Sequence, residues 1–124
     1  LLPRQTALNE EELLSRVDGD RALIGELAEI FREDYPQHLQ ELRSAVQQGN
    51  ETAVRQTGHT LKGMLANLAA PHARDLAAQI EELGKKGDLR PIGPILDELL
   101  LELRRVDGAL EIFCPAVQSE NPSR

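Results

Sequence analysis

The sequence predicts an all-α protein, namely an antiparallel four-helix bundle with a short additional N-terminal helix. Leu, Ala, Glu and Arg, which favour helices, recur along the 124-residue chain, whereas aromatic residues make up only 2% of it. Apolar residues recur at helical rather than alternating spacing within each long segment. Short turns join these segments, and helices joined in this way pack as antiparallel neighbours.

Capping residues delimit the first two predicted helices. Asn9 can cap a helix that ends near Val17, and Asp20 can cap a much longer helix that runs to Gln48. Pro36 lies inside this second helix. Because proline lacks a backbone N–H and clashes with the preceding turn, we expect a kink or a short gap there.

The third and fourth helices are also bounded by turn residues. Asn50 can cap a helix over 51–69, and a helix over 71–86 follows with proline at its favoured first position. Gly84 and Gly87 are expected to mark the end of this fourth helix.

The last helix is expected to start at Asp88 or Gly93 and to end near Phe113. Its apolar seam consists of Leu96, Leu99, Leu103, Val106 and Leu110. We therefore predict a leader over 1–7, one helical domain over 8–113 and a disordered tail over 114–124.

The charge balance argues against two classes of partner. With 21 acidic and 14 basic residues, the net charge is -7, which repels nucleic acid and anionic membranes. No apolar run approaches the length that spans a bilayer, so we expect no membrane contact by this domain. The single cysteine, Cys114, fits a reducing compartment, and we expect a cytoplasmic location.

His59 is the side chain that helical geometry singles out. It lies about 150° from the centre of the apolar stripe of its helix, so its ring should face solvent. Arg55 and Lys62 lie one turn before and one turn after it, while Gly63 and Ala66 offer little steric obstruction. The stripe itself is formed by Val54, Thr57, Gly58, Leu61, Leu65 and Leu68.

An exposed histidine in this setting has two interpretations. A neutral imidazole is a competent nucleophile near neutral pH, and neighbouring cations could offset the charge of a phosphoryl group bound to it. A solvent-facing histidine between Arg and Lys on a helix is more often an ordinary surface residue. The geometry alone leaves both open.

The stretch from Gly58 through His59-Thr60-Leu61-Lys62-Gly63 to Leu68 resembles the signature of histidine-containing phosphotransfer domains. That signature has a histidine, a hydrophobic residue two positions later, and then Lys-Gly. The resemblance covers roughly residues 8–106. It implies that His59 is phosphorylated, that Lys62 stabilises the phosphoryl group and that Gly63 leaves room for the partner.

Two positions depart from the family pattern. Met64 stands where a small residue is common, and Ala69 stands where glycine is frequent. We expect Met64 to alter packing without abolishing transfer. Docking of the partner is expected around His59, with Ala66 in the patch and Arg55 among the charged residues near it.

The function that this resemblance implies is that of a phosphorelay intermediate. His59 would accept a phosphoryl group from the aspartate of one response-regulator receiver domain and pass it to another. The domain would be a phosphocarrier without ATP-dependent kinase activity or a cofactor of its own, and Mg²⁺ would be held by the receiver. The carrier would be either a separate protein or part of a covalently linked hybrid sensor kinase, in which case it would lie in the cytoplasmic part of a membrane-bound kinase.

Two alternatives remain open at this point. One is a helical adaptor or dimerisation domain without phosphotransfer, and the other is the phosphoryl-accepting domain of a chemotaxis-type kinase. Other candidate site residues are weaker. His38 and His72 lack a second metal ligand at helical spacing and are interpreted as surface residues. The adjacent Glu81 and Glu82 point about 100° apart on a helix and are assigned to a solvated face.

Overall fold

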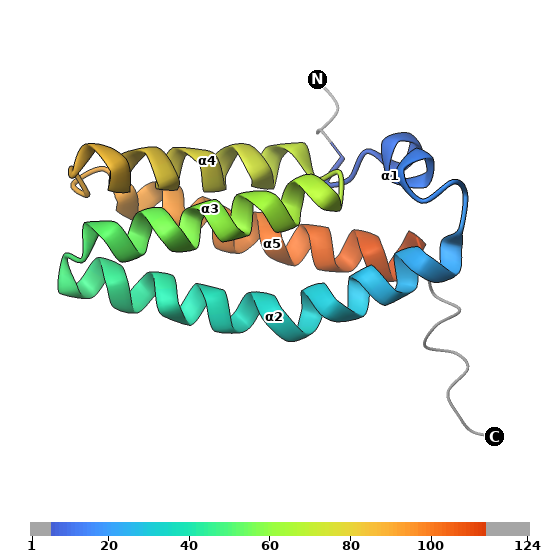
Figure 1. Cartoon of the computed structure of the whole chain (residues 1–124), viewed down its shortest axis with the longest axis horizontal. Helices are drawn as coiled ribbons and strands as arrows, with labels where there is room; N and C mark the ends of the chain where they lie inside the picture. The colour runs from blue at the N-terminus through green and yellow to red at the C-terminus, as the bar shows by residue number, and fades with distance from the viewer. Residues whose placement is uncertain (1–5, 114–124) are drawn as a thin grey trace.

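The computed structural model describes residues 6–113, which form five α-helices and no strand. The four long helices lie side by side as an antiparallel bundle, and the short first helix lies across one end of it (Figure 1). This is the predicted architecture. The helices are α1 (Glu10–Arg16), α2 (Arg21–Gln48), α3 (Glu51–Asn67), α4 (Pro71–Lys86) and α5 (Ile92–Phe113). None of these helices is both long enough and apolar enough to cross a membrane.

The three predicted N-terminal caps are confirmed. The side-chain oxygens of Asn9, Asp20 and Asn50 each accept a hydrogen bond from a backbone N–H three residues later, at 3.0, 3.2 and 3.1 Å. These bonds satisfy donors that the first turn of a helix leaves free. At the other end, Gly49 and Gly87 adopt the left-handed conformation that closes α2 and α4.

Pro36 bends α2 without interrupting it. The helix is continuous from Arg21 to Gln48, so the expected short gap does not occur, and Figure 1 shows α2 bent along its length. Leu23 near the start of this helix is 39% exposed, whereas Phe31 and Leu42 further along are buried.

The core fills the space between all four long helices and extends to α1. The predicted seam of α5 faces the core: Leu99, Leu103, Val106 and Leu110 are completely buried, and Leu96 is partly buried. The other large side chains that are fully buried are Leu13, Ile24, Phe31, Leu42, Val54, Leu61, Leu65 and Ile80.

Helix α3 ends at Asn67, two residues before the predicted end, because Ala69 takes a left-handed conformation with φ 55°. An L-residue with a Cβ pays about 1–2 kcal/mol for that conformation, which accounts for the frequent glycine at this position. The carbonyl of Ala69 accepts a hydrogen bond from the backbone N–H of Asn9 at 2.7 Å. This bond fastens the start of α1 to the end of α3.

Gly84 does not end α4, contrary to the sequence-based expectation. It lies buried inside the helix, against the backbone of α3, where a Cβ would come within 2.6 Å of the backbone nitrogen of Arg55. Gly58 on α3 is its counterpart, since a Cβ there would lie 2.8 Å from the backbone nitrogen of Glu81. Each helix therefore presents a glycine to the backbone of the other, and α3 and α4 approach closely.

Candidate functional site

His59 lies on the outer face of α3, as the helical phase predicted. Its side chain is 69% exposed. The core of the bundle is on the opposite side of the helix, where Leu61 and Leu65 are fully buried. The imidazole is therefore accessible to a partner molecule.

The partner of His59 within the chain is Glu81, which the sequence had assigned to a solvated face. This assignment is wrong, because the side chain of Glu81 is only 16% exposed. Its Oε2 lies 3.0 Å from Nδ1 of His59, and its Oε1 lies 2.7 Å from Nζ of Lys62. One carboxylate of α4 thus bridges two side chains of α3.

The electrostatics of this bridge determine which ring nitrogen carries a proton. The hydrogen bond from Lys62 is the main factor that lowers the pKa of Glu81 below its ordinary value, and the bond to His59 acts in the same direction against desolvation. Glu81 is therefore an ionised carboxylate, which can only accept hydrogen bonds. It follows that Nδ1 of His59 donates, and a neutral ring then has an unprotonated Nε2.

Gly58 explains how Glu81 comes within reach of the ring. Glycine at this position lets the α4 backbone at Glu81 approach α3 at the residue that precedes His59. Glycines inside two neighbouring helices were the signal in the sequence that could have indicated this contact. They had been interpreted as part of the apolar stripe at Gly58 and as a helix end at Gly84.

The other predicted site residues lie along the same outer face of α3. Gly63 is exposed, and a Cβ there would meet no other atom within 4 Å. Arg55 is exposed one turn before His59 and forms no ion pair within residues 6–113. Ala66 is half-buried. The ammonium group of Lys62 is held by the carboxylate of Glu81.

A small apolar groove of about 90 Å³ lies between α2 and α3. The residues that line it on the α3 side follow Gly63 in the sequence. Met64 contributes to its wall and also packs against the core. Ile30 on the α2 side is 53% exposed. The complete lining is Leu27, Ile30, Phe31, Asp34, Met64, Asn67 and Leu68.

The other two histidines have different surroundings. Nδ1 of His38 lies 3.4 Å from Glu41 on the same helix, and Nε2 of His72 lies 3.2 Å from Glu98 on α5. Among the residues that the structure describes, no group of three His, Cys, Asp or Glu side chains could hold a metal ion.

Comparisons with known proteins agree on one family. The Hpt domain family matches residues 26–109. Histidine-containing phosphotransfer protein B from Pseudomonas aeruginosa PAO1 has a similar structure, with a TM-score of 0.81 and 23% identity over 88% of this chain and 95% of that one. The HPT domain of a sensor hybrid histidine kinase from Shewanella gives a TM-score of 0.75 and 23% identity, over 94% and 97% of the two chains. No curated protein matches the sequence significantly.

Proposed function

The chain belongs to the Hpt domain family, whose members transfer phosphoryl groups in phosphorelays, and we propose that His59 is the residue that carries the phosphoryl group in this protein. In this proposal His59 accepts the group from the aspartate of one receiver domain and passes it to another. The observation that carries the proposal is the exposed ring held through Nδ1 by a nearly buried, ionised Glu81.

The chemical step follows from the protonation of the ring. The lone pair of Nε2 attacks the phosphorus of the aspartyl phosphate, the N–P bond forms, and the P–O bond to the aspartate breaks. The aspartate leaves as a carboxylate. The ring becomes a phosphorylated imidazolium, whose positive charge is offset by Glu81 at the 3.0 Å contact with Nδ1. Glu81 therefore orients the ring and stabilises the charge that develops on it.

Lys62 and Gly63 have supporting roles in this proposal. The ammonium of Lys62 lies one turn from His59 and shares the Glu81 carboxylate with it, so it can contact a phosphoryl oxygen after a small rotation. Gly63 leaves open the space through which a receiver reaches the ring, because in-line transfer requires close approach.

The receiver is expected to dock along the outer face of α3 and onto the groove between α2 and α3. The exposed Ile30 and the wall formed by Met64 supply apolar contact area beside Gly63, with Ala66 on the same helix. Arg55 supplies a positive charge near this surface. We propose that the domain brings no cofactor of its own, and that the receiver supplies both the aspartate and its Mg²⁺.

The test is transfer from a receiver domain labelled with radioactive phosphate. Wild-type protein should take up an acid-labile label, and the variant His59→Gln should take up none. His72→Gln is the matched control and should behave as wild type, because it removes a different histidine that contacts a glutamate. A folded wild type that accepts no label, or equal labelling of His59→Gln, would contradict the proposal.

A further inference from the structure

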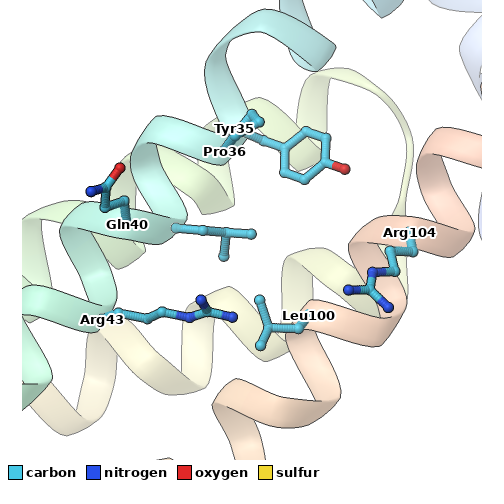
Figure 2. A pocket seen from close by; sticks show the side chains of 7 residues that line it. Tyr35, Pro36, Gln40, Arg43, Leu100 and Arg104 are labelled. Carbon is cyan, nitrogen blue, oxygen red and sulfur yellow. The ribbon is translucent and has the colours of Figure 1, made fainter.

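A second cavity lies between α2 and α5, the seam on the opposite side of the bundle from the α3–α4 contact that holds His59 (Figure 1). Its volume of about 450 Å³ falls within the range of small-molecule sites, which runs from roughly 300 to 1,000 Å³. Pro36, where α2 bends, is part of its wall. The lining residues are Tyr35, Pro36, Leu39, Gln40, Arg43, Leu100 and Arg104 (Figure 2).

Two arginines converge on this cavity from different helices. Figure 2 shows Arg43 on α2 and Arg104 on α5 with their guanidinium groups pointing toward the side chain of Leu100. Neither forms an ion pair or a hydrogen bond within residues 6–113, and no acidic side chain lines the cavity.

These two arginines, like Arg55, form no ion pair within residues 6–113, whereas five other arginines of that range do. The chain has a net charge of -7, and Arg16, Arg32, Arg74, Arg90 and Arg105 each contact a carboxylate. Burial and the neighbouring Asp107 carboxylate raise the pKa of Tyr35, which is part of the cavity wall. Asp107 itself is already held by Arg32 at 2.6 Å, which leaves the guanidinium groups of the cavity available.

The remaining walls are suited to the body of an organic molecule. Leu39 and Leu100 provide aliphatic surface, and Tyr35 provides an aromatic ring. This ring stacks on Phe31, with ring centroids 4.6 Å apart. A guanidinium binds phosphate or carboxylate oxygens in bidentate fashion. The cavity therefore combines cationic groups for an anion with an apolar and aromatic surface.

We infer that the α2–α5 cavity binds a small organic anion that carries two or more phosphate or carboxylate oxygens on an apolar or aromatic body. A nucleoside diphosphate has this chemistry and is the probe that we choose. Because the cavity lies on the seam opposite His59, a bound ligand would leave the docking face free. The inference does not depend on phosphotransfer.

Titration calorimetry with ADP in the absence of divalent cations tests this inference. Wild type should bind ADP saturably, and Arg43→Gln and Arg104→Gln should each weaken binding by about tenfold or more, since each removes a charge-assisted contact. The matched control is Arg55→Gln, which removes an arginine without an ion pair on the α3 face and should change the affinity less than about twofold. Circular dichroism would establish that the variants are folded.

Two fragments of the probe sharpen the result. Adenosine lacks the anionic groups and pyrophosphate lacks the organic body, so each should bind at least about tenfold more weakly than ADP. The inference is overturned if folded wild type shows no saturable binding, or if Arg55→Gln weakens binding as much as Arg43→Gln. Equal binding of either fragment would likewise overturn it. The variant His59→Gln should bind ADP as wild type does, which separates this test from that of phosphotransfer.

Discussion

His59 and His72 each contact a glutamate of the next helix along the chain, yet the two pairs are built in opposite ways. At His59 the ring is 69% exposed and the carboxylate of Glu81 only 16% exposed. At His72 the ring is 36% exposed and the carboxylate of Glu98 is 56% exposed. The first pair has a fixed carboxylate and an accessible ring, whereas the second has an exposed carboxylate and a more covered ring.

The nitrogen that makes the contact differs as well. Glu81 lies against Nδ1 of His59 and leaves Nε2, the nitrogen farther from the backbone, for a partner. Glu98 lies against Nε2 of His72 and occupies that outer nitrogen. Lys62 holds the second oxygen of Glu81, and no cation holds that of Glu98 within the described part of the chain. In the proposed function, the anchored carboxylate and the free outer nitrogen therefore distinguish His59 from His72 as the nucleophile.

The largest effect is expected from Glu81→Gln. This substitution removes the negative charge beside His59 and keeps a side chain of nearly the same size and shape. Loss of the charge that offsets the phosphorylated imidazolium should slow transfer from a phosphorylated receiver by about tenfold to a hundredfold, the equivalent of one strong charge-assisted hydrogen bond. Rapid-quench measurement of labelled protein would give the rate.

Glu98→Gln is the control for this substitution. It makes the same chemical change in the exposed pair, and transfer should slow by less than about twofold because surface pairs contribute little. Equal rates for Glu81→Gln and wild type would show that the anchored carboxylate is dispensable.

A smaller effect is expected from Gly58→Ala, which separates His59 from Glu81 by pushing α3 and α4 apart. The added methyl would lie 2.8 Å from the backbone nitrogen of Glu81, so α4 must move away from His59. We expect a loss of about 1–2 kcal/mol in the free energy of unfolding, measured by urea denaturation, because overpacking outweighs the helix propensity of alanine.

Gly63→Ala makes the identical change five residues later on the same helix. Its methyl would meet open space, so the variant should gain about 0.5–1 kcal/mol. If the two substitutions shifted stability in the same direction, the close approach at Gly58 would not be what positions Glu81.

The bundle could be predicted because its determinants are local. Asn9, Asp20 and Asn50 cap helices through bonds that span three residues, and the apolar seam of α5 follows helical periodicity. Pro36 was harder to interpret, since sequence indicates a disturbed helix but the surrounding packing decides between a bend and a break.

The site could be predicted only in part, because only some of its determinants are local in the sequence. The exposure of His59 depends on the phase of one helix, which the sequence reveals. The contact with Glu81 depends on how two helices are placed relative to each other, and the pair is separated by 22 residues in the chain. The reciprocal glycines at 58 and 84 set that placement, and their effect becomes visible only when both helices are seen together.

The smallest effect concerns the pH dependence of stability. It should differ between the His59–Glu81 pair and the His72–Glu98 pair, because the carboxylate of Glu81 is more strongly stabilised in its charged form. In the folded protein the bond from Lys62 holds the pKa of Glu81 below its ordinary value of 4.5. A lowered pKa means that the carboxylate stabilises the fold above the pKa of the unfolded chain, and that this contribution disappears as the pH falls through the folded pKa.

The difference in unfolding free energy between wild type and Glu81→Gln should therefore be present just above the ordinary value of 4.5 and should shrink below it. We expect the difference to be about 1 kcal/mol at most. Urea denaturation in a series of acidic buffers would measure it, with Glu98→Gln in parallel, for which only a few tenths of a kcal/mol are expected from an exposed pair. A difference for Glu81→Gln that grew with acidification would contradict the ionised bridge, and with it the assignment of the proton to Nδ1 of His59.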